Sequence, residues 1–206
     1  MSLVSHLLKK CINNDKSLEN EEKHGNMDMK NSKELMEQVI NETLAGLSIY
    51  VRDQNLEPKF EEQYRKDTII REKGFTDASS RNGGIITTHR LAILSNHMMD
   101  LSQLEEGTNW GLSVAKNDAH FKVLDISKIK DKTLITILHL PDNENWKLFE
   151  NVKIDVEETI IEESRKCFEK HLKEAPIPEL ATDVWLERCS FPIGMDDNGR
   201  LWPLED

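Results

Sequence analysis

Four of the seven histidines in this chain lie between residues 89 and 139. Histidine is the side chain best suited to proton transfer and metal binding near neutral pH. Three of them, His89, His120 and His139, fall in stretches with the composition of β-strands. Asp125 has apolar neighbours on both sides, and such a setting can raise the pKa of a carboxyl group toward a catalytic range. The candidate catalytic residues are therefore His89, His120, His139 and Asp125.

A metal site is a second interpretation of the same residues. Two or three of these histidines, with Asp118 or Asp125, can form a site of the histidine–carboxylate type. His97, the fourth histidine, lies beyond the end of its strand. No pair has the HExxH spacing, and no two lie two positions apart on one strand. Because a histidine on an apolar strand face is more often a hydrogen-bonded structural residue, the sequence predicts no metal and no cofactor.

Nucleophile motifs are absent from the sequence. Cys167 and Cys189 lie on the apolar faces of predicted helices, where a thiol is buried and inert. Ser95 and Ser113 lack the GxSxG context of a nucleophile elbow. The three cysteines form no CxxC pair, which is typical of a reducing compartment, so the cytoplasm is the expected location.

The net charge of −11 is concentrated in the last third of the chain. Residues 141–206 contain 8 basic and 17 acidic side chains, a balance of −9. Such a surface repels nucleic acids and anionic membranes and favours basic proteins. No apolar run approaches the 18 or so residues of a membrane helix, and the sequence predicts neither a nucleic-acid nor a membrane partner.

All four tryptophans lie in the second half of the chain, beside this acidic region. Tryptophan is most often a core residue, but an exposed one among carboxylates suits a binding hot spot for a basic protein. The candidate partner-binding residues are Trp146, Trp185, Glu162 and Glu163.

The elements that must position these residues follow from the hydrophobic pattern. Residues 1–12 have a helical apolar stripe, and residues 13–31 read as a flexible linker. Asn31 and Glu34 resemble a capping box at the start of a helix that extends to Val51, and Pro58 begins a second helix.

Four strands are predicted in the middle of the chain, over residues 85–95, 108–115, 120–129 and 132–141. The short links KNDA and KDK indicate hairpins between the last three. A helix opening at Asp155, a short helix over residues 182–189 and a turn at residues 197–199 complete the chain.

We therefore expect residues 1–30 to form a short amphipathic helix with a linker, and residues 31–206 to form one α+β domain. Its sheet is predicted to be four-stranded and mainly antiparallel, packed against N-terminal and C-terminal helices. The acidic surface predicts a protein-binding module, such as an inhibitor or immunity-type protein that neutralises a basic partner. The alternative is a small hydrolase with a His/Asp site on the sheet; the sequence does not decide whether the chain is an enzyme.

Overall fold

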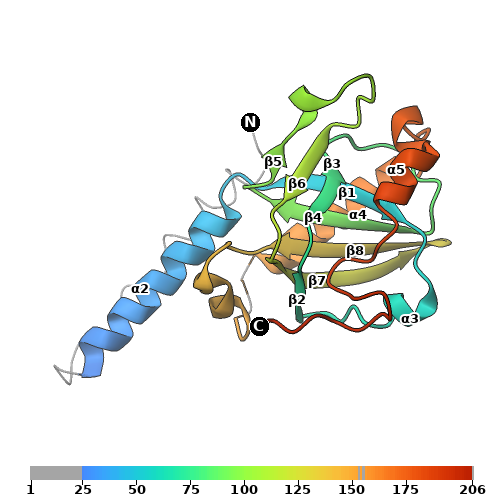
Figure 1. Ribbon diagram of the computed structural model, residues 1–206. Coiled ribbons are helices and arrows are strands. Elements are labelled where there is room, and N and C mark those ends of the chain that lie inside the picture. The colour runs from blue at the N-terminus through green and yellow to red at the C-terminus, as the bar shows by residue number, and fades with distance from the viewer. Residues whose placement is uncertain (1–24, 153, 155, 206) are drawn as a thin grey trace.

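The computed structural model describes residues 25–152, 154 and 156–205 (Figure 1). The predicted helix of residues 1–12 and most of the predicted linker lie outside these residues. The first described element, α2, is a helix over Gly25–Leu44, so helix begins six residues before Asn31. The division of the chain at residue 30 stays a prediction.

One mixed sheet of eight strands forms the body of the protein, in the order β2-β7-β8-β4-β1-β3-β6-β5. All neighbours are antiparallel except β4 and β8. The strands are β1 (Ser48–Gln54), β2 (Ile69–Glu72), β3 (Thr76–Ser79), β4 (His89–Ser95), β5 (Met99–Asp100), β6 (Leu112–Ala115), β7 (Ala119–Ile129) and β8 (Lys132–His139). The α+β class and the mainly antiparallel pairing are confirmed, whereas the prediction of four strands is wrong.

The remaining elements are short, apart from one long helix. They are α3 (Pro58–Glu61), three 3-10 helices, η2 (Ser102–Leu104), η3 (Glu144–Phe149) and η4 (Pro178–Ala181), and the helices α4 (Glu157–His171) and α5 (Asp183–Arg188). No helix in the described part of the chain is long and apolar enough to cross a membrane.

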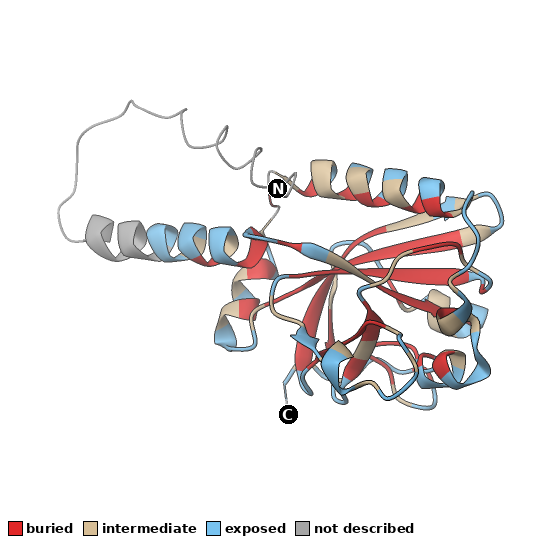
Figure 2. Ribbon diagram, turned by 90° about the horizontal axis from the view of Figure 1, so that it is seen from above, coloured by how far each residue is buried: buried red, intermediate tan, exposed pale blue. Residues whose placement is uncertain are grey.

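Both faces of the sheet are covered, which explains the continuous apolar runs of the central strands. All seven residues of β4 are buried, as Figure 2 shows for the sheet centre. On one face Leu91 and Ile93 pack with Ile193 and Met195 of the C-terminal segment. On the other face Leu94 and Leu138 pack with residues of α2, η3 and α4. A strand that is buried on both faces loses the alternation of polar and apolar residues.

Helix α2 ends earlier than the sequence predicted, and strand β1 follows it. Gly46 adopts a φ of 71°, the left-handed conformation that terminates helices and that glycine adopts without strain. The next residues, Ser48 to Val51, pair with β4 in full register. Because Leu47 and Val51 continue a helical spacing, the hydrophobic pattern alone extended the helix across this boundary.

Residues 85–88 precede β4 and lie outside any strand. Their path is set by Gly84, which forms an isolated parallel bridge with Pro176. A Cβ atom at Gly84 would lie 2.2 Å from the Glu174 carbonyl oxygen, so only glycine permits this approach. The predicted strand is therefore correct from His89 onward and too long at its start.

One of the two predicted hairpins is confirmed. Strands β7 and β8 pair antiparallel through a tight turn at Lys130 and Asp131, and Lys130 has a positive φ of 58°. Strands β6 and β7 are also consecutive, but they are not neighbours in the sheet. The link KNDA therefore connects two distant parts of the sheet instead of forming a hairpin.

Candidate metal centre

Three side chains with metal-ligating atoms meet where β4 and β8 end: His97, His139 and Asp142. Strands β4 and β8 are parallel, with Leu94 opposite Leu138. Their carboxyl ends therefore lie at the same edge of the sheet. His139 is the last residue of β8, and the other two residues follow shortly after the ends of β4 and β8.

The ligating atoms face one another. Oδ1 of Asp142 lies 3.8 Å from Nε2 of His97 and 3.7 Å from Nε2 of His139. The two imidazole rings stack with centroids 3.9 Å apart and planes inclined by 25°. One ligand atom from each of the three side chains fits within a mutual separation of 4.8 Å.

The other ring nitrogen of each histidine is already hydrogen-bonded. Nδ1 of His139 lies 2.9 Å from Ser95 Oγ, and Nδ1 of His97 lies 2.8 Å from Asn96 Oδ1. Both Nε2 atoms are buried and have no hydrogen-bond partner among the described residues. Metal-ligating histidines characteristically use their second nitrogen for an oriented hydrogen bond and leave the first to the metal.

Burial favours the neutral form of His97, and hydrogen bonds favour the ionised form of Asp142. Burial lowers the pKa of His97, and the neighbouring His139 lowers it further. The polar contact with His139 holds the pKa of Asp142 well below its usual range, and the hydrogen bond from Lys116 adds a smaller effect in the same direction. Lys116 donates to Oδ2 of Asp142 over 2.8 Å, which leaves Oδ1 toward the imidazoles. Metal binding requires neutral imidazole and ionised carboxylate.

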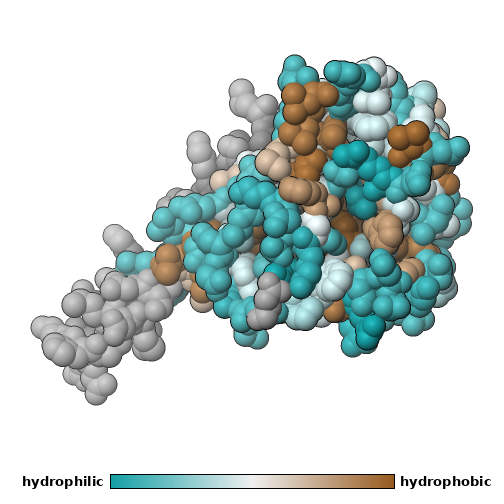
Figure 3. Space-filling view, in the orientation of Figure 1, coloured by the Kyte–Doolittle hydropathy of each residue, from teal (hydrophilic) through white to brown (hydrophobic). Residues whose placement is uncertain are grey.

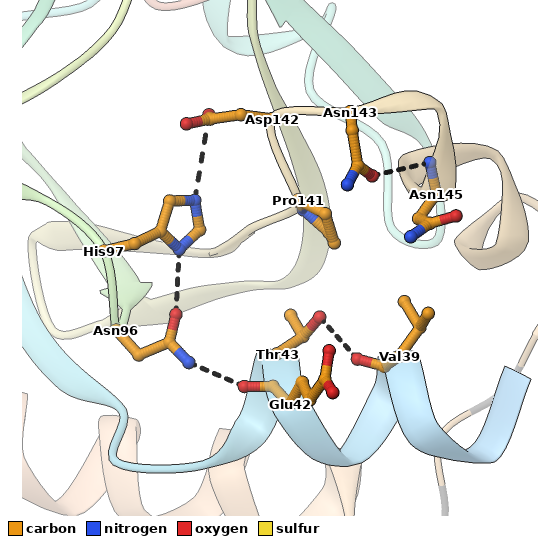
Figure 4. Close-up of a pocket in the computed structure, with 9 residues that line it drawn as sticks. All are labelled: Val39, Glu42, Thr43, Asn96, His97, Pro141, Asp142, Asn143 and Asn145. Atoms are coloured by element: carbon orange, nitrogen blue, oxygen red, sulfur yellow. Dashed lines mark hydrogen bonds and ion pairs between the residues drawn. The ribbon is translucent and has the colours of Figure 1, made fainter. Parts of the chain in front are cut away.

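A pocket of about 250 Å³ opens beside this centre (Figure 4). His97 and Asp142 form part of its wall, and α2 contributes the opposite side. The other lining residues are mostly polar: Val39, Glu42, Thr43, Asn96, Pro141, Asn143 and Asn145. The pocket therefore borders the His97 and Asp142 side of the centre.

The order Ser95–His139–Asp142 resembles a catalytic triad, but the serine is unsuited to attack a substrate. Ser95 is fully buried, and its Oγ accepts a hydrogen bond from the His97 amide over 3.2 Å. A nucleophile must reach the substrate. The serine is therefore a support for the two histidines.

The four predicted catalytic residues do not converge; no hydrogen bond, ion pair or ring contact joins any two of them in the described part of the chain. Nε2 of His120 lies 3.0 Å from the Leu204 carbonyl oxygen, and its ring stacks on Trp146 at 4.2 Å. Nε2 of His89 lies 3.1 Å from the Glu61 carboxylate, at the opposite end of β4 from the centre. Of the four, only His139 belongs to the centre.

Asp125, the fourth candidate, joins β7 to α4. Arg165 donates to its two oxygens over 2.9 and 2.7 Å, and Ser127 donates to one of them. Burial pushes the pKa of Asp125 upward, but these hydrogen bonds outweigh it and hold the pKa below its ordinary value. The carboxylate thus stays ionised and binds the helix to the sheet.

Replacing Asp125 by asparagine should destabilise the protein by about 1 kcal/mol near pH 7, a value reduced for the partial exposure of Arg165. Since the folded pKa is depressed, the stabilisation is present above the unfolded pKa and is lost as pH falls through the folded pKa. Urea denaturation of the wild type and of Asp125→Asn should therefore give free energies of unfolding whose difference is constant at neutral pH. This difference should shrink below about pH 4. A difference that stays unchanged down to pH 2 would contradict this role.

The predicted partner-binding residues are divided between core and surface. Trp146 is 5% exposed and Trp185 is 1% exposed, and each packs in a hydrophobic cluster. Glu162 is exposed, and Glu163 forms an ion pair with Lys166 over 2.8 Å. On the face in Figure 3, hydrophobic groups are separated by hydrophilic ones. The two tryptophans are thus unavailable as surface anchors in this structure.

Sequence reasoning considered His97 and His139 but did not select Asp142 as their partner. The available signal was the spacing His139-Leu140-Pro141-Asp142, in which a carboxylate follows a strand-end histidine by three residues. Asp142 looked like one of many acidic residues in the acidic third of the chain. His97 lies near His139 because β4 and β8 pair in parallel, and no local sequence pattern predicts that pairing.

No protein-family model matches the sequence, and no curated protein sequence matches it. Solved structures do show a partial likeness. The type III effector XopAI from Xanthomonas axonopodis pv. citri is 13% identical, with a TM-score of 0.42; the match covers 50% of this chain and 48% of that one. This chain thus spans about half the length of that effector.

Two further structures show a partial likeness. Exoenzyme S from Pseudomonas aeruginosa, solved in complex with human 14-3-3 protein beta and bound to carba-NAD, is 10% identical, with a TM-score of 0.42 over 68% of this chain and 70% of that one. The ADP-ribosyltransferase HopU1 of Pseudomonas syringae pv. tomato DC3000 is 12% identical, with a TM-score of 0.39 over 52% of this chain and 50% of that one.

The prediction of an immunity-type or inhibitor module is wrong, because the chain resembles type III effectors and ADP-ribosyltransferases instead. The small-hydrolase alternative lacks its predicted site, because His89, His120 and Asp125 have separate structural partners. At a TM-score of 0.42 and 13% identity, an activity does not transfer from one chain to another. The function proposed next therefore rests on the geometry of the centre.

Proposed function

We propose that this protein binds a divalent transition-metal ion through Nε2 of His97, Nε2 of His139 and Oδ1 of Asp142. The observation that carries the proposal is the pair of buried imidazole nitrogens that face one carboxylate oxygen and have no hydrogen-bond partner among the described residues. Leaving a buried polar atom unpaired costs about 1–3 kcal/mol, and a metal ion removes that cost at both nitrogens.

The donor set fits an ion of the zinc type. Two imidazoles and one carboxylate suit Zn²⁺ and its neighbours, with metal–ligand distances of about 2.0–2.2 Å. Ligands at that distance in a tetrahedron lie roughly 3.3 Å apart. The separations of 3.7 and 3.8 Å to Asp142 are only slightly larger. Because the two rings are stacked with planes inclined by 25°, they must also rotate before both Nε2 lone pairs point at one ion.

Three protein ligands leave at least one coordination position open, and the adjoining pocket borders two of the three ligands, His97 and Asp142. When bound, such an ion supplies Lewis acidity to a water or to an oxygen-containing ligand. The protein contributes the orientation of the ligands: Ser95 and Asn96 fix the imidazoles, and Lys116 fixes the carboxylate.

Titration of the full-length protein with Zn²⁺ in a calorimeter should reveal one saturable site per chain. Asp142→Asn removes the charged ligand at an exposed position without changing the shape of the side chain. We expect the Zn²⁺ affinity of this variant to fall by more than about 100-fold, since outer-shell partners alone are worth 10–100-fold. His139→Ala should abolish the site.

His120→Gln is the matched control, because His120 is a buried imidazole that is hydrogen-bonded to Leu204 and lies outside the centre. Its affinity for Zn²⁺ should equal that of the wild type. Substituting Co²⁺ gives a second readout, because its visible absorption reports the number of ligands. Absence of saturable binding in the wild type, or equal affinity in Asp142→Asn, would refute the proposal.

A further inference from the structure

One amide side chain connects the metal centre to the long helix that projects from the domain (Figures 1 and 4). Nδ2 of Asn96 donates to the carbonyl oxygens of Glu42, over 2.7 Å, and Ala45, over 2.9 Å. These carbonyls belong to the last turn of α2 and the residue after it. Oδ1 of the same amide faces Nδ1 of His97 at 2.8 Å.

These contacts fix the orientation of the amide. A carbonyl oxygen can only accept hydrogen bonds, so the group facing Glu42 and Ala45 must be the NH₂ of Asn96. The oxygen is then the atom that faces His97, and it can only accept. Nδ1 of His97 must therefore carry the hydrogen. In a neutral imidazole the other nitrogen, Nε2, then presents its lone pair toward Asp142.

We infer that Asn96 is a positioning residue that sets the tautomer of His97 through the last turn of α2. The end of α2 holds the side-chain amide of Asn96, and this amide selects the Nδ1–H tautomer of His97. In that tautomer the lone pair of Nε2 points toward Asp142. The tautomer assignment stands on these contacts alone; its consequence for metal affinity rests on the function proposed above.

The arrangement also couples metal binding to the packing of α2. The last two turns of this helix pack on the core through Val39 and Leu44, and Gly46 ends it next to the Asn96 contacts. A conformation in which this turn moves away releases the amide and with it the tautomer preference. Since coupling between two sites is reciprocal, an ion in the centre must in turn stabilise the end of α2.

Nitrogen NMR of the metal-free full-length protein at pH 8 tests the tautomer directly. We expect His97 to be protonated on Nδ1 in the wild type. Asn96→Ala should populate the Nε2–H tautomer, because the acceptor is gone. Asn96→Asp keeps an acceptor for Nδ1–H while it loses the donor to α2, so it should retain the Nδ1–H tautomer. A wild-type protein with its hydrogen on Nε2 would overturn the inference, whatever the outcome of metal titrations.

Zn²⁺ affinity supplies the second test. Asn96→Ala should bind Zn²⁺ 10- to 100-fold more weakly than the wild type, and Asn96→Asp should lose less. Asn55→Ala is the control, because Asn55 is also an exposed amide that anchors backbone, accepting from the Thr88 amide over 2.9 Å. In the wild type, Zn²⁺ should slow hydrogen exchange of the last turn of α2, and this effect should vanish in Asn96→Ala.

The two proposals fail in different ways. No Zn²⁺ binding by the wild type, with the Nδ1–H tautomer still present, would refute the metal site and leave the positioning role of Asn96 intact. Normal Zn²⁺ binding by Asn96→Ala, with an unchanged tautomer, would refute the positioning role and leave the metal site intact.

Discussion

Replacing Leu138 by aspartate should destabilise the protein by more than about 4 kcal/mol, which is a large part of the 5–15 kcal/mol that stabilises a typical domain. Leu138 is fully buried in β8, between β4 and β7. It packs in the cluster that contains Leu94, Leu124 and Trp146. A carboxylate there lies opposite Lys122 of β7, whose ammonium group already pairs with Glu157 over 3.2 Å. The new side chain must therefore compete with Glu157 for this buried cation or take up a proton.

Ile86→Asp is the control for this substitution. Although the sequence places Ile86 in a buried strand, it is 49% exposed in the segment before β4. We expect its effect to stay within about 0.5 kcal/mol. Urea denaturation followed by tryptophan fluorescence measures both variants. Equal denaturation midpoints for wild type and Leu138→Asp would contradict the position of β8 at the centre of the sheet.

The second large effect should come from Asp53→Ala, which we expect to cost about 3–5 kcal/mol. Asp53 and Arg90 face each other on β1 and β4 and form two hydrogen bonds of 2.7 Å, with both side chains at most 9% exposed. Arg90 also donates to the Gly83 carbonyl oxygen over 2.9 Å. Removing the carboxylate leaves a buried guanidinium without its counter-charge.

The double variant Asp53→Leu/Arg90→Met separates a buried-charge effect from a packing effect. Replacing both partners by apolar residues removes the unpaired charge, and such replacements are often neutral or stabilising. We therefore expect the double variant to recover most of the stability that Asp53→Ala loses, as measured by thermal and urea denaturation. A double variant as unstable as Asp53→Ala would show that packing, and not charge, dominates at this position.

Elements governed by local patterns were predictable from the sequence. The helix α4 follows from its apolar spacing, and the β7–β8 hairpin follows from two strand patterns joined by a short polar link. The closing turn near the C-terminus is also present: Met195 pairs with Leu201, and Gly199 has a φ of 76°. In each case the residues that decide the structure are close together in the sequence.

Other elements could not be predicted from local sequence patterns. Strand β1 was assigned to a helix, because its apolar residues continue the spacing of α2. Strands β2 and β3 have four residues each and include charged side chains, and they were missed. Their strand conformation depends on backbone pairing with β7, β1 and β6. Short strands are stabilised by their neighbours and carry little signal of their own.

The sequence by itself determined the α+β class and the mainly antiparallel sheet, and it indicated His139 as a residue for chemistry. Only the tertiary structure brought His97 and Asp142 to it. Ser95 and His139 are 44 residues apart, yet their side chains are in contact, because β4 and β8 are parallel neighbours. A parallel pair needs a long connection, so its partners cannot be identified from adjacent residues. Of the three residues of the centre the sequence selected only His139, and strand order decided which residues join it.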